Sequence, residues 1–377
     1  MLYWLFYEKL FHYFTPFRVF GYDTFRTALA SLTALFLCIA LGPWLIGKLR
    51  QLQIGQHIRE DGPQSHLNKS GTPTMGGVLI VISIVVPTLL WANLSNPYIW
   101  IALFALVSFG AIGFYDDYAK IRRQRSLGLT ARDKFLLQVA ASLLVGVALL
   151  SLHARGMYDT SINFPFFKQF KPDLLIYPLL HNPITYPLAF AGFYLFMILV
   201  MAGFSNGVNL TDGLDGLAIG LMIIAAGAMT VLTYVTGHAK FADYLGLAHF
   251  SGASELTIFC AAMTGASIGF LWYNAHPAQV FMGDVGALAL GGGLGCLAVL
   301  IKQEVLLLFI GGVYVIETLS VVLQVGSYKL RKKRIFKMAP LHHHFEAIGW
   351  PESKIIIRFW IAGLVLALFA LTTLKLR

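Results

Sequence analysis

The sequence predicts an all-α integral membrane protein, and three observations point to that fold class. The 377-residue chain is 57% hydrophobic, with a mean hydropathy of +0.71. Only 12% of its residues are charged, whereas soluble domains carry about 25%. Apolar runs of about 20 residues, long enough to cross a bilayer as helices, recur along the chain. These runs lack the period-2 alternation of a transmembrane β-barrel.

Ten runs are predicted to be transmembrane helices, and residues 1–377 are predicted to form a single polytopic membrane domain. The spans are expected at residues 24–48, 75–94, 98–116, 135–152, 184–203, 214–236, 255–273, 285–301, 304–328 and 354–375. Residues 1–20 are rich in aromatic side chains and lack both an early basic region and a cleavage site. They are therefore predicted to be a retained interfacial segment and not a signal peptide.

The distribution of Lys and Arg predicts the orientation of the chain in the membrane. The loops that follow odd-numbered spans carry 17 of the 28 Lys and Arg residues. Positively charged short loops stay in the cytoplasm, so these loops, including residues 329–353, are expected to be cytoplasmic. Both termini and the loop 154–183 are then expected to be periplasmic. The net charge of +10 thus reflects topology, and no nucleic-acid partner is expected.

The cysteines exclude one class of site. Cys38, Cys260 and Cys296 all lie inside apolar runs. An odd number of separated thiols in such positions argues against disulfides and against a Cys-based metal site.

Four polar clusters lie at the predicted cytoplasmic ends of the spans. They are Asp116–Asp117 after the third span, Asn206–Asp215 after the fifth, Asp284 at the start of the eighth and His342–His344 after the ninth. A charge at membrane depth costs about 2.5–3.5 kcal/mol, so such groups persist where they pair, bind an ion or do chemistry. Their shared side predicts one active-site cleft on the cytoplasmic face.

The aspartate pair closes the third span. Adjacent helical positions point about 100° apart, so the two carboxylates are expected not to share one partner. Carboxylates at a helix C-terminus oppose the helix dipole. This favours a catalytic role for Asp116 and Asp117 over a merely solvated helix end.

The cluster after the fifth span has a regular spacing. Asn206, Asn209, Asp212 and Asp215 recur every three residues, which would line them on one side of a helix as substrate-binding groups. The alternative is an N-cap, in which Thr211 or Asp212 starts the next span. An N-cap does not account for the two asparagines.

Asp284 begins the eighth span, where it is either an N-cap or an oxygen ligand for a hard cation. Mg²⁺ in proteins typically binds one or two carboxylates together with water and substrate phosphates. Asp284 is therefore the preferred metal ligand, and Asp117 is a second candidate.

Three consecutive histidines, His342, His343 and His344, cannot all face one metal from a regular helix, and no Cys partner suits zinc. Protonated histidines that bind phosphate or nucleotide oxygens fit this cluster better than a solvated interfacial loop. Glu317, near the middle of the ninth span, is either a helix–helix hydrogen-bonding group or part of the site.

Five motifs give the chain a resemblance to a known family over nearly its whole length, from about Phe25 to Arg377. The motifs are Gly71-Thr-Pro-Thr-Met-Gly-Gly77, Phe114-Tyr-Asp-Asp-Tyr118, Asn209-Leu-Thr-Asp-Gly-Leu-Asp-Gly-Leu-Ala218, Phe281-Met-Gly-Asp-Val-Gly286 and Pro340-Leu-His-His-His-Phe-Glu346. They resemble the phospho-N-acetylmuramoyl-pentapeptide transferases, within the polyprenyl-phosphate N-acetylhexosamine-1-phosphate transferase superfamily. The histidine motif narrows the resemblance to the muramoyl-pentapeptide branch.

The resemblance implies a multi-pass enzyme of the bacterial inner (cytoplasmic) membrane. It implies Mg²⁺-dependent transfer of phospho-N-acetylmuramoyl-pentapeptide from UDP-MurNAc-pentapeptide to undecaprenyl phosphate. The products are lipid I and UMP, in the first membrane step of peptidoglycan synthesis. The catalytic pair matches Asp116 and Asp117, and the metal-binding aspartate matches Asp284. The implied substrate contacts are Lys69, Thr74, Lys134, Asn209, Asp212, His342, His343 and Phe281, the last by stacking on uracil.

Several alternatives stay open at this stage. One is a polyprenyl-phosphate GlcNAc-1-phosphate transferase, and another is an ion-coupled transporter, although transporters commonly show inverted repeats and midplane sites. Either Asp116 or Asp117 could be the base, and catalysis could proceed by direct attack or through an aspartyl-phosphate. Lipid-facing residues in the first and last spans permit a homodimer.

Overall fold

The computed structural model describes residues 1–52, 71–123, 128–165, 167, 170–181, 185–247, 249–250 and 252–375. Within these ranges every regular element is a helix and no β-strand forms. The all-α prediction is therefore confirmed.

Eight described helices are long and apolar enough to cross a membrane, and a bent helix pair makes a ninth if the two helices together count as one span. The eight are α1 (Asp23–Gln51), α3 (Pro97–Arg123), α4 (Ala131–Ala154), α6 (Ala191–Thr211), α7 (Leu217–Gly237), α9 (Ala253–Asn274), α10 (Gly283–Leu300) and α14 (Glu352–Thr372). The predicted second span corresponds to α2 (Gly77–Trp91), which is apolar but only 15 residues long. All ten predicted runs thus correspond to helices, with the main differences in the fifth and ninth.

The fifth span starts later and ends later than predicted. Residues 186–189 form a separate short helix, α5 (Tyr186–Ala189), and α6 continues to Thr211. Asn206 and Asn209 are therefore helical, and lie in the last turns of a membrane-spanning helix.

The ninth span is broken. Helices α11 (Glu304–Ile310) and α12 (Gly312–Arg331) meet at 83° across Gly311. Two adjacent glycines, Gly311 and Gly312, stand at this bend, as is usual for sharp helix kinks. The hydropathy of residues 304–328 predicts the apolar length of the span but not the change in direction.

Helix α10 is the buried axis of the bundle. Every side chain from Val285 to Leu300 is buried, and α3 and α6 pack along its length. Glycines allow the first turn of α10 to pack closely against α2. A β-carbon at Gly77 of α2 would overlap the backbone of Gly286 in α10. This close packing fixes the end of α10 that carries Asp284.

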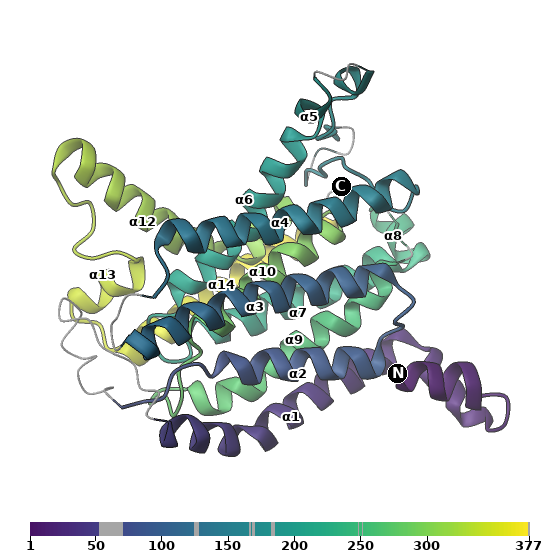
Figure 1. Cartoon of the computed structure of the whole chain (residues 1–377), viewed down its shortest axis with the longest axis horizontal. Coiled ribbons are helices and arrows are strands. Elements are labelled where there is room, and N and C mark those ends of the chain that lie inside the picture. Colours follow the sequence, from purple (N-terminus) through teal and green to yellow (C-terminus); the bar gives the residue numbers. More distant parts are fainter. Residues whose placement is uncertain are drawn as a thin grey trace.

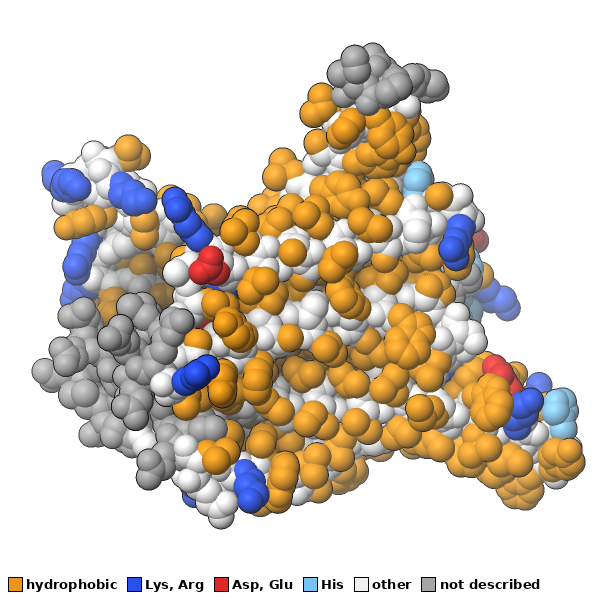
Figure 2. Space-filling model, in the orientation of Figure 1, with side chains coloured by type: hydrophobic (Ala, Val, Ile, Leu, Met, Phe, Trp, Pro, Cys, Tyr) orange, Lys and Arg blue, Asp and Glu red, His pale blue; other side chains and the backbone are white. Residues whose placement is uncertain are grey.

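The elements with the predicted site residues gather at one end of the bundle. Helices α12 and α13 (Leu341–Ala347) lie at that end, at the left of Figure 1, whereas both termini lie toward the opposite end. Figure 2 shows a broad hydrophobic face along the bundle with Lys and Arg side chains toward its ends. The compartment that each end faces stays a prediction.

The remaining short elements lie mostly outside the bundle. Trp4–Leu10 and Thr15–Gly21 form two short helices that extend beside the N-terminus of α1 (Figure 1), and their interfacial position stays a prediction. The loop 154–183 is mostly irregular where it is described, with an isolated bridge between Ser161 and Asp173. Helix α8 (Ala239–Leu245) follows α7.

Candidate active site

Three aspartates from two helices converge. One carboxylate oxygen each of Asp116, Asp117 and Asp284 lies within 4.8 Å of the others. Asp116 and Asp117 are only 3% exposed. The approach of α3 to α10 depends on Gly113, because a β-carbon there would overlap the carbonyl group of Asp284. Asp284 lies 167 positions after Asp117 in the sequence, and the packing of the two helices brings them together.

Two lysines bind this aspartate cluster. Lys120 Nζ lies 2.6 Å from Asp116 Oδ2, 3.1 Å from Asp117 Oδ1 and 2.8 Å from Asp284 Oδ2. Lys134 Nζ, from α4, lies 2.8 Å from Asp284 Oδ2. The expectation that the aspartate pair would not share a partner is therefore wrong. Lys120 follows the two aspartates by four and three residues, and its long side chain reaches both carboxylates.

Further hydrogen bonds orient each carboxylate. Asp116 Oδ1 accepts from the backbone amide of Leu129 at 2.7 Å, and Asp117 Oδ2 accepts from that of Val285 at 3.3 Å. Asn209 Nδ2 donates to Asp284 Oδ1 at 2.6 Å. The structure thus brings Asn209 into the same cluster as the three aspartates.

The regular line of Asn206, Asn209, Asp212 and Asp215 does not form, because α6 ends at Thr211. Asn206 instead exchanges hydrogen bonds with Gln138 of α4, at 2.7 and 3.3 Å. The N-cap alternative is also wrong. Helix α7 begins after Gly216, which has a φ of +77° and provides no side-chain cap.

Asp212 lies in the turn between α6 and α7. Burial of the carboxyl group, together with three neighbouring carboxylates, raises the pKa of Asp212 to about 8. The neighbouring carboxylates belong to Asp284, Asp117 and Asp215. This part of the site therefore holds more acidic groups than its two lysines balance.

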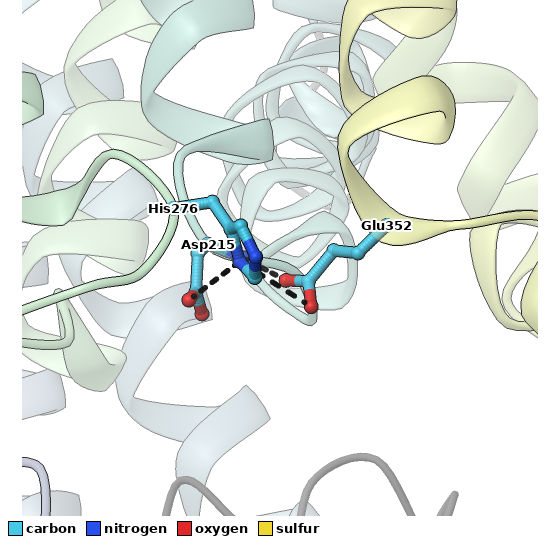
Figure 3. Close-up of side chains that lie close together, drawn as sticks. All are labelled: Asp215, His276 and Glu352. Carbon is cyan, nitrogen blue, oxygen red and sulfur yellow. Dashed lines mark hydrogen bonds and ion pairs between the residues drawn. The ribbon is translucent and has the colours of Figure 1, made fainter.

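Asp215 belongs to a second cluster, shown in Figure 3. Its Oδ2 accepts from the backbone amide of Ala278 at 3.0 Å and lies 3.3 Å from His276 Nδ1. Glu352 Oε1 accepts from the Asp215 amide at 3.0 Å, and Glu352 Oε2 lies 3.6 Å from His276 Nδ1. This second cluster joins the α6–α7 turn to the α9–α10 loop and the start of α14. Its donor atoms could also hold a metal ion.

The three histidines lie on α13, a helix within the predicted loop 329–353. As expected for consecutive residues, they have separate partners. His342 Nδ1 lies 3.2 Å from Glu317 Oε1, and His343 Nδ1 lies 2.6 Å from Glu346 Oε2. His344 Nδ1 accepts from the Lys337 amide at 3.2 Å.

The remaining predicted residues flank the aspartate cluster where they are described. Thr74 Oγ1 and Asp117 Oδ2 both border Gly283, which has a φ of +69°. Phe281 joins the same region, since its amide donates to the Pro73 carbonyl and its carbonyl accepts from the Gly76 amide, at 2.8 and 2.9 Å. Lys69 lies outside the described residues.

An apolar groove approaches the cluster from the side of the bundle. It has a volume of about 240 Å³ and is lined by α6 and by the bent pair α11 and α12. Its lining includes Phe196 at one end of α6 and Gly207 near the other. Gly207 is two residues from Asn209, or about 3 Å along the helix axis. The groove therefore ends at the level of the α6 turn that carries Asn209, although Gly207 and Asn209 point about 200° apart around the helix.

Comparison with known proteins places the chain in a family. The family model of glycosyl transferase family 4 matches residues 99–302, which include all three clustered aspartates. Together with the helical fold, this match defines a membrane-embedded transferase.

More specific matches follow. A phospho-N-acetylmuramoyl-pentapeptide-transferase signature matches residues 69–81. The chain is 67% identical to the phospho-N-acetylmuramoyl-pentapeptide-transferase of Solibacter usitatus, 66% to that of Acidobacterium capsulatum and 65% to that of Koribacter versatilis, with 100% of each chain covered. The chain belongs to the phospho-N-acetylmuramoyl-pentapeptide-transferase family.

Proposed function

We propose that this protein transfers phospho-N-acetylmuramoyl-pentapeptide from UDP-MurNAc-pentapeptide to undecaprenyl phosphate, forming lipid I and releasing UMP. The observation that carries the proposal is the aspartate–lysine cluster at the same end of α6 as one end of an apolar groove. Such a site can hold the phosphates of a soluble nucleotide sugar beside the phosphate of a lipid whose chain lies in the groove. The names of the close relatives support this choice of substrates.

The lipid chain has room along α6. The groove runs from Phe196 to Gly207, a distance of about 16 Å along the helix at 1.5 Å per residue. Its walls are almost entirely apolar, as an isoprenoid chain requires. A chain seated there would place its phosphate near Asn209 and the aspartate cluster.

The charges of the cluster suit a divalent cation. Among the described residues, the carboxyl groups of Asp116, Asp117 and Asp284 meet two ammonium groups, those of Lys120 and Lys134, and the buried carboxyl group of Asp212 lies nearby. Hard oxygen donors of this kind are the usual ligands of Mg²⁺. Asp284 would hold the ion, with Asp117 as a second ligand. When bound, Mg²⁺ would offset negative charge on the diphosphate.

In the proposed reaction, a phosphate oxygen of the lipid attacks the β-phosphorus of the nucleotide sugar. The bond from that phosphorus to the bridging oxygen breaks, and UMP leaves with this oxygen. One diphosphate bond is lost and one is formed, so no ATP is needed. Lys120 and Lys134 stabilise the negative charge of the transferring group, which is the main requirement of phosphoryl transfer.

Asp117 is the better candidate for the base that removes a proton from the lipid phosphate. Both oxygens of Asp116 are engaged at short distances, by the Leu129 amide at 2.7 Å and by Lys120 at 2.6 Å. Among the described residues, Asp117 Oδ2 accepts one longer hydrogen bond, of 3.3 Å from Val285, and it borders Gly283, as Thr74 does. Inversion of configuration at the transferred phosphorus would indicate direct attack, and retention an aspartyl-phosphate.

The site is proposed to face the cytoplasm of a bacterium, with the protein in the inner membrane, because the basic loop 329–353, between α12 and α14, lies at its end of the bundle. The test is release of labelled UMP from UDP-MurNAc-pentapeptide by the detergent-solubilised protein. Release is expected only with polyprenyl phosphate and without EDTA. Offering UDP-GlcNAc in parallel separates the GlcNAc-1-phosphate transferase alternative. Equal turnover of UDP-GlcNAc, or release of UMP at the same rate without polyprenyl phosphate, would contradict the proposal.

A further inference from the structure

Glu317 is a buried carboxylate with an unusual set of partners. It lies on α12, within a predicted membrane span, and is 0% exposed. Its Oε2 accepts from the Leu341 amide at 2.6 Å, and its Oε1 accepts from the His342 amide at 3.2 Å. These two amides open α13, whose N-cap residue, Pro340, provides no side-chain cap. Glu317 therefore caps a helix that is 24 residues further along the chain.

The same carboxylate orients the first histidine of α13. Glu317 Oε1 lies 3.2 Å from His342 Nδ1, and His342 is 0% exposed. The opposite ring nitrogen, Nε2, faces Gly213, next to Asp212. Among the described residues neither ring nitrogen makes a hydrogen bond, so Nδ1 meets Glu317 as a close ion-pair contact and Nε2 has no partner. A buried nitrogen without a partner is costly, unless a ligand completes its hydrogen bonding.

From this geometry we infer that Glu317 is a positioning residue for the transfer reaction. It fixes the ring of His342 against the turn that carries Asp212, and it leaves Nε2 available to an oxygen of the bound phosphates. The inference rests on the proposed function, because the ligand of Nε2 is a substrate phosphate. Among the described residues the carboxylate of Glu317 contacts the Leu341 and His342 amides and the His342 ring of α13, so it acts through the histidine.

Helix α12, which carries Glu317, also lines the apolar groove proposed for the lipid chain. Tyr314 and Thr318, which flank Glu317 on the same helix, line the apolar groove. Thr318 further borders Gly207 of α6. One helix thus forms a wall of the groove on one side and holds the histidine helix on another.

The test is a double-mutant cycle on UMP release, with Glu317→Ala, His342→Ala and the double variant. Loss of a residue that orients an active-site histidine typically costs about 10- to 100-fold in activity. We expect Glu317→Ala to lower kcat by that factor with little change in the KM for polyprenyl phosphate. The double variant should be no less active than His342→Ala alone, because both changes remove one function.

Two further variants keep the test decisive. Glu317→Gln retains an acceptor for the α13 amides, so it should fold and lose only about tenfold, again without further loss when combined with His342→Ala. Ser320→Ala is the matched control, because the Ser320 hydroxyl donates only to the Glu317 carbonyl within α12, at 2.7 Å. It should retain wild-type turnover.

The outcomes separate the two proposals. Wild-type protein that releases no UMP would overturn the proposed function itself. Active wild-type protein together with fully active Glu317 variants, or with losses that multiply in the double variant, would overturn only the positioning role.

Discussion

Gly113 offers a test of the site through a residue that carries no chemistry. It lies on α3, one turn before the aspartate pair, and faces the first turn of α10. A β-carbon at this position would lie 2.6 Å from the amide nitrogen of Val285, and closer still to the carbonyl oxygen of Asp284. Side-chain β-carbons essentially never approach other atoms within 3.0 Å. A Gly113→Ala change therefore requires α10 to move away from α3 by about 1 Å.

That movement separates Asp284 from Asp116 and Asp117. A misplacement of about 1 Å can cost about 10²-fold in rate, so Gly113→Ala is expected to lower UMP release by about that factor. The measurement is steady-state UMP release in detergent, with thermal unfolding midpoints recorded for each variant. Gly110→Ala is the matched control on α3, since a β-carbon there would lie 3.3 Å from its nearest neighbours, the side chains of Ala289 and Val81.

A clear result would refute this reasoning. If Gly113→Ala turned over within a few-fold of wild type, the spacing of α3 and α10 would not limit the reaction. Equal losses in Gly110→Ala and Gly113→Ala would show a general loss of packing and not a displaced aspartate.

Four other substitutions test three separate parts of the structure. Asp117→Asn and Asp284→Asn should each lower UMP release by at least about 10²-fold, the usual cost of losing a general base or a key electrostatic group, and near-normal turnover of either variant would count against its role. Gly203→Leu fills open space in the apolar groove and should raise the KM for polyprenyl phosphate about tenfold, or about 1.4 kcal/mol, without changing the KM for the nucleotide. Gly227→Leu is also in open space but outside the groove lining, so it should change neither KM value. Equal effects of the two substitutions would argue against a lipid in the groove. Arg26→Ala should destabilise the protein by about 3–5 kcal/mol, because it leaves the buried carboxylate of Glu255, which Arg26 binds at 2.7 Å, without its charged partner. A free energy of unfolding within about 1 kcal/mol of the wild-type value would contradict this prediction.

Composition and motif spacing were sufficient to predict the fold class, the number of apolar segments and the aspartates that converge. They could not predict the 83° bend between α11 and α12, because hydropathy measures the length of a span and not its direction. The i+3 spacing of Asn206 to Asp215 suggested one continuous helix. The chain instead leaves the helix after Thr211, so Asn209 reaches Asp284 while Asp215 binds a different cluster.

Residues near the site differ in how much local signal the sequence gives for them. Lys120 lies three and four residues after the aspartate pair on one helix, a spacing that predicts contact with both. His276 and Glu352 meet Asp215 only through tertiary packing. Glu317 was recognisable in the sequence as a carboxylate in an apolar span. Its partner, helix α13, lies within a stretch that was expected to be a loop, so the contact between them could not be predicted.

Binding of Mn²⁺ as a substitute for Mg²⁺ distinguishes the two clusters of described residues that could hold a metal ion. Electron paramagnetic resonance would count the bound Mn²⁺ in wild-type protein, Asp284→Asn and Glu352→Gln. The account predicts that Asp284→Asn loses the ion and that Glu352→Gln retains it. Loss of the ion in Glu352→Gln, with retention in Asp284→Asn, would place the metal at the second cluster and contradict the account.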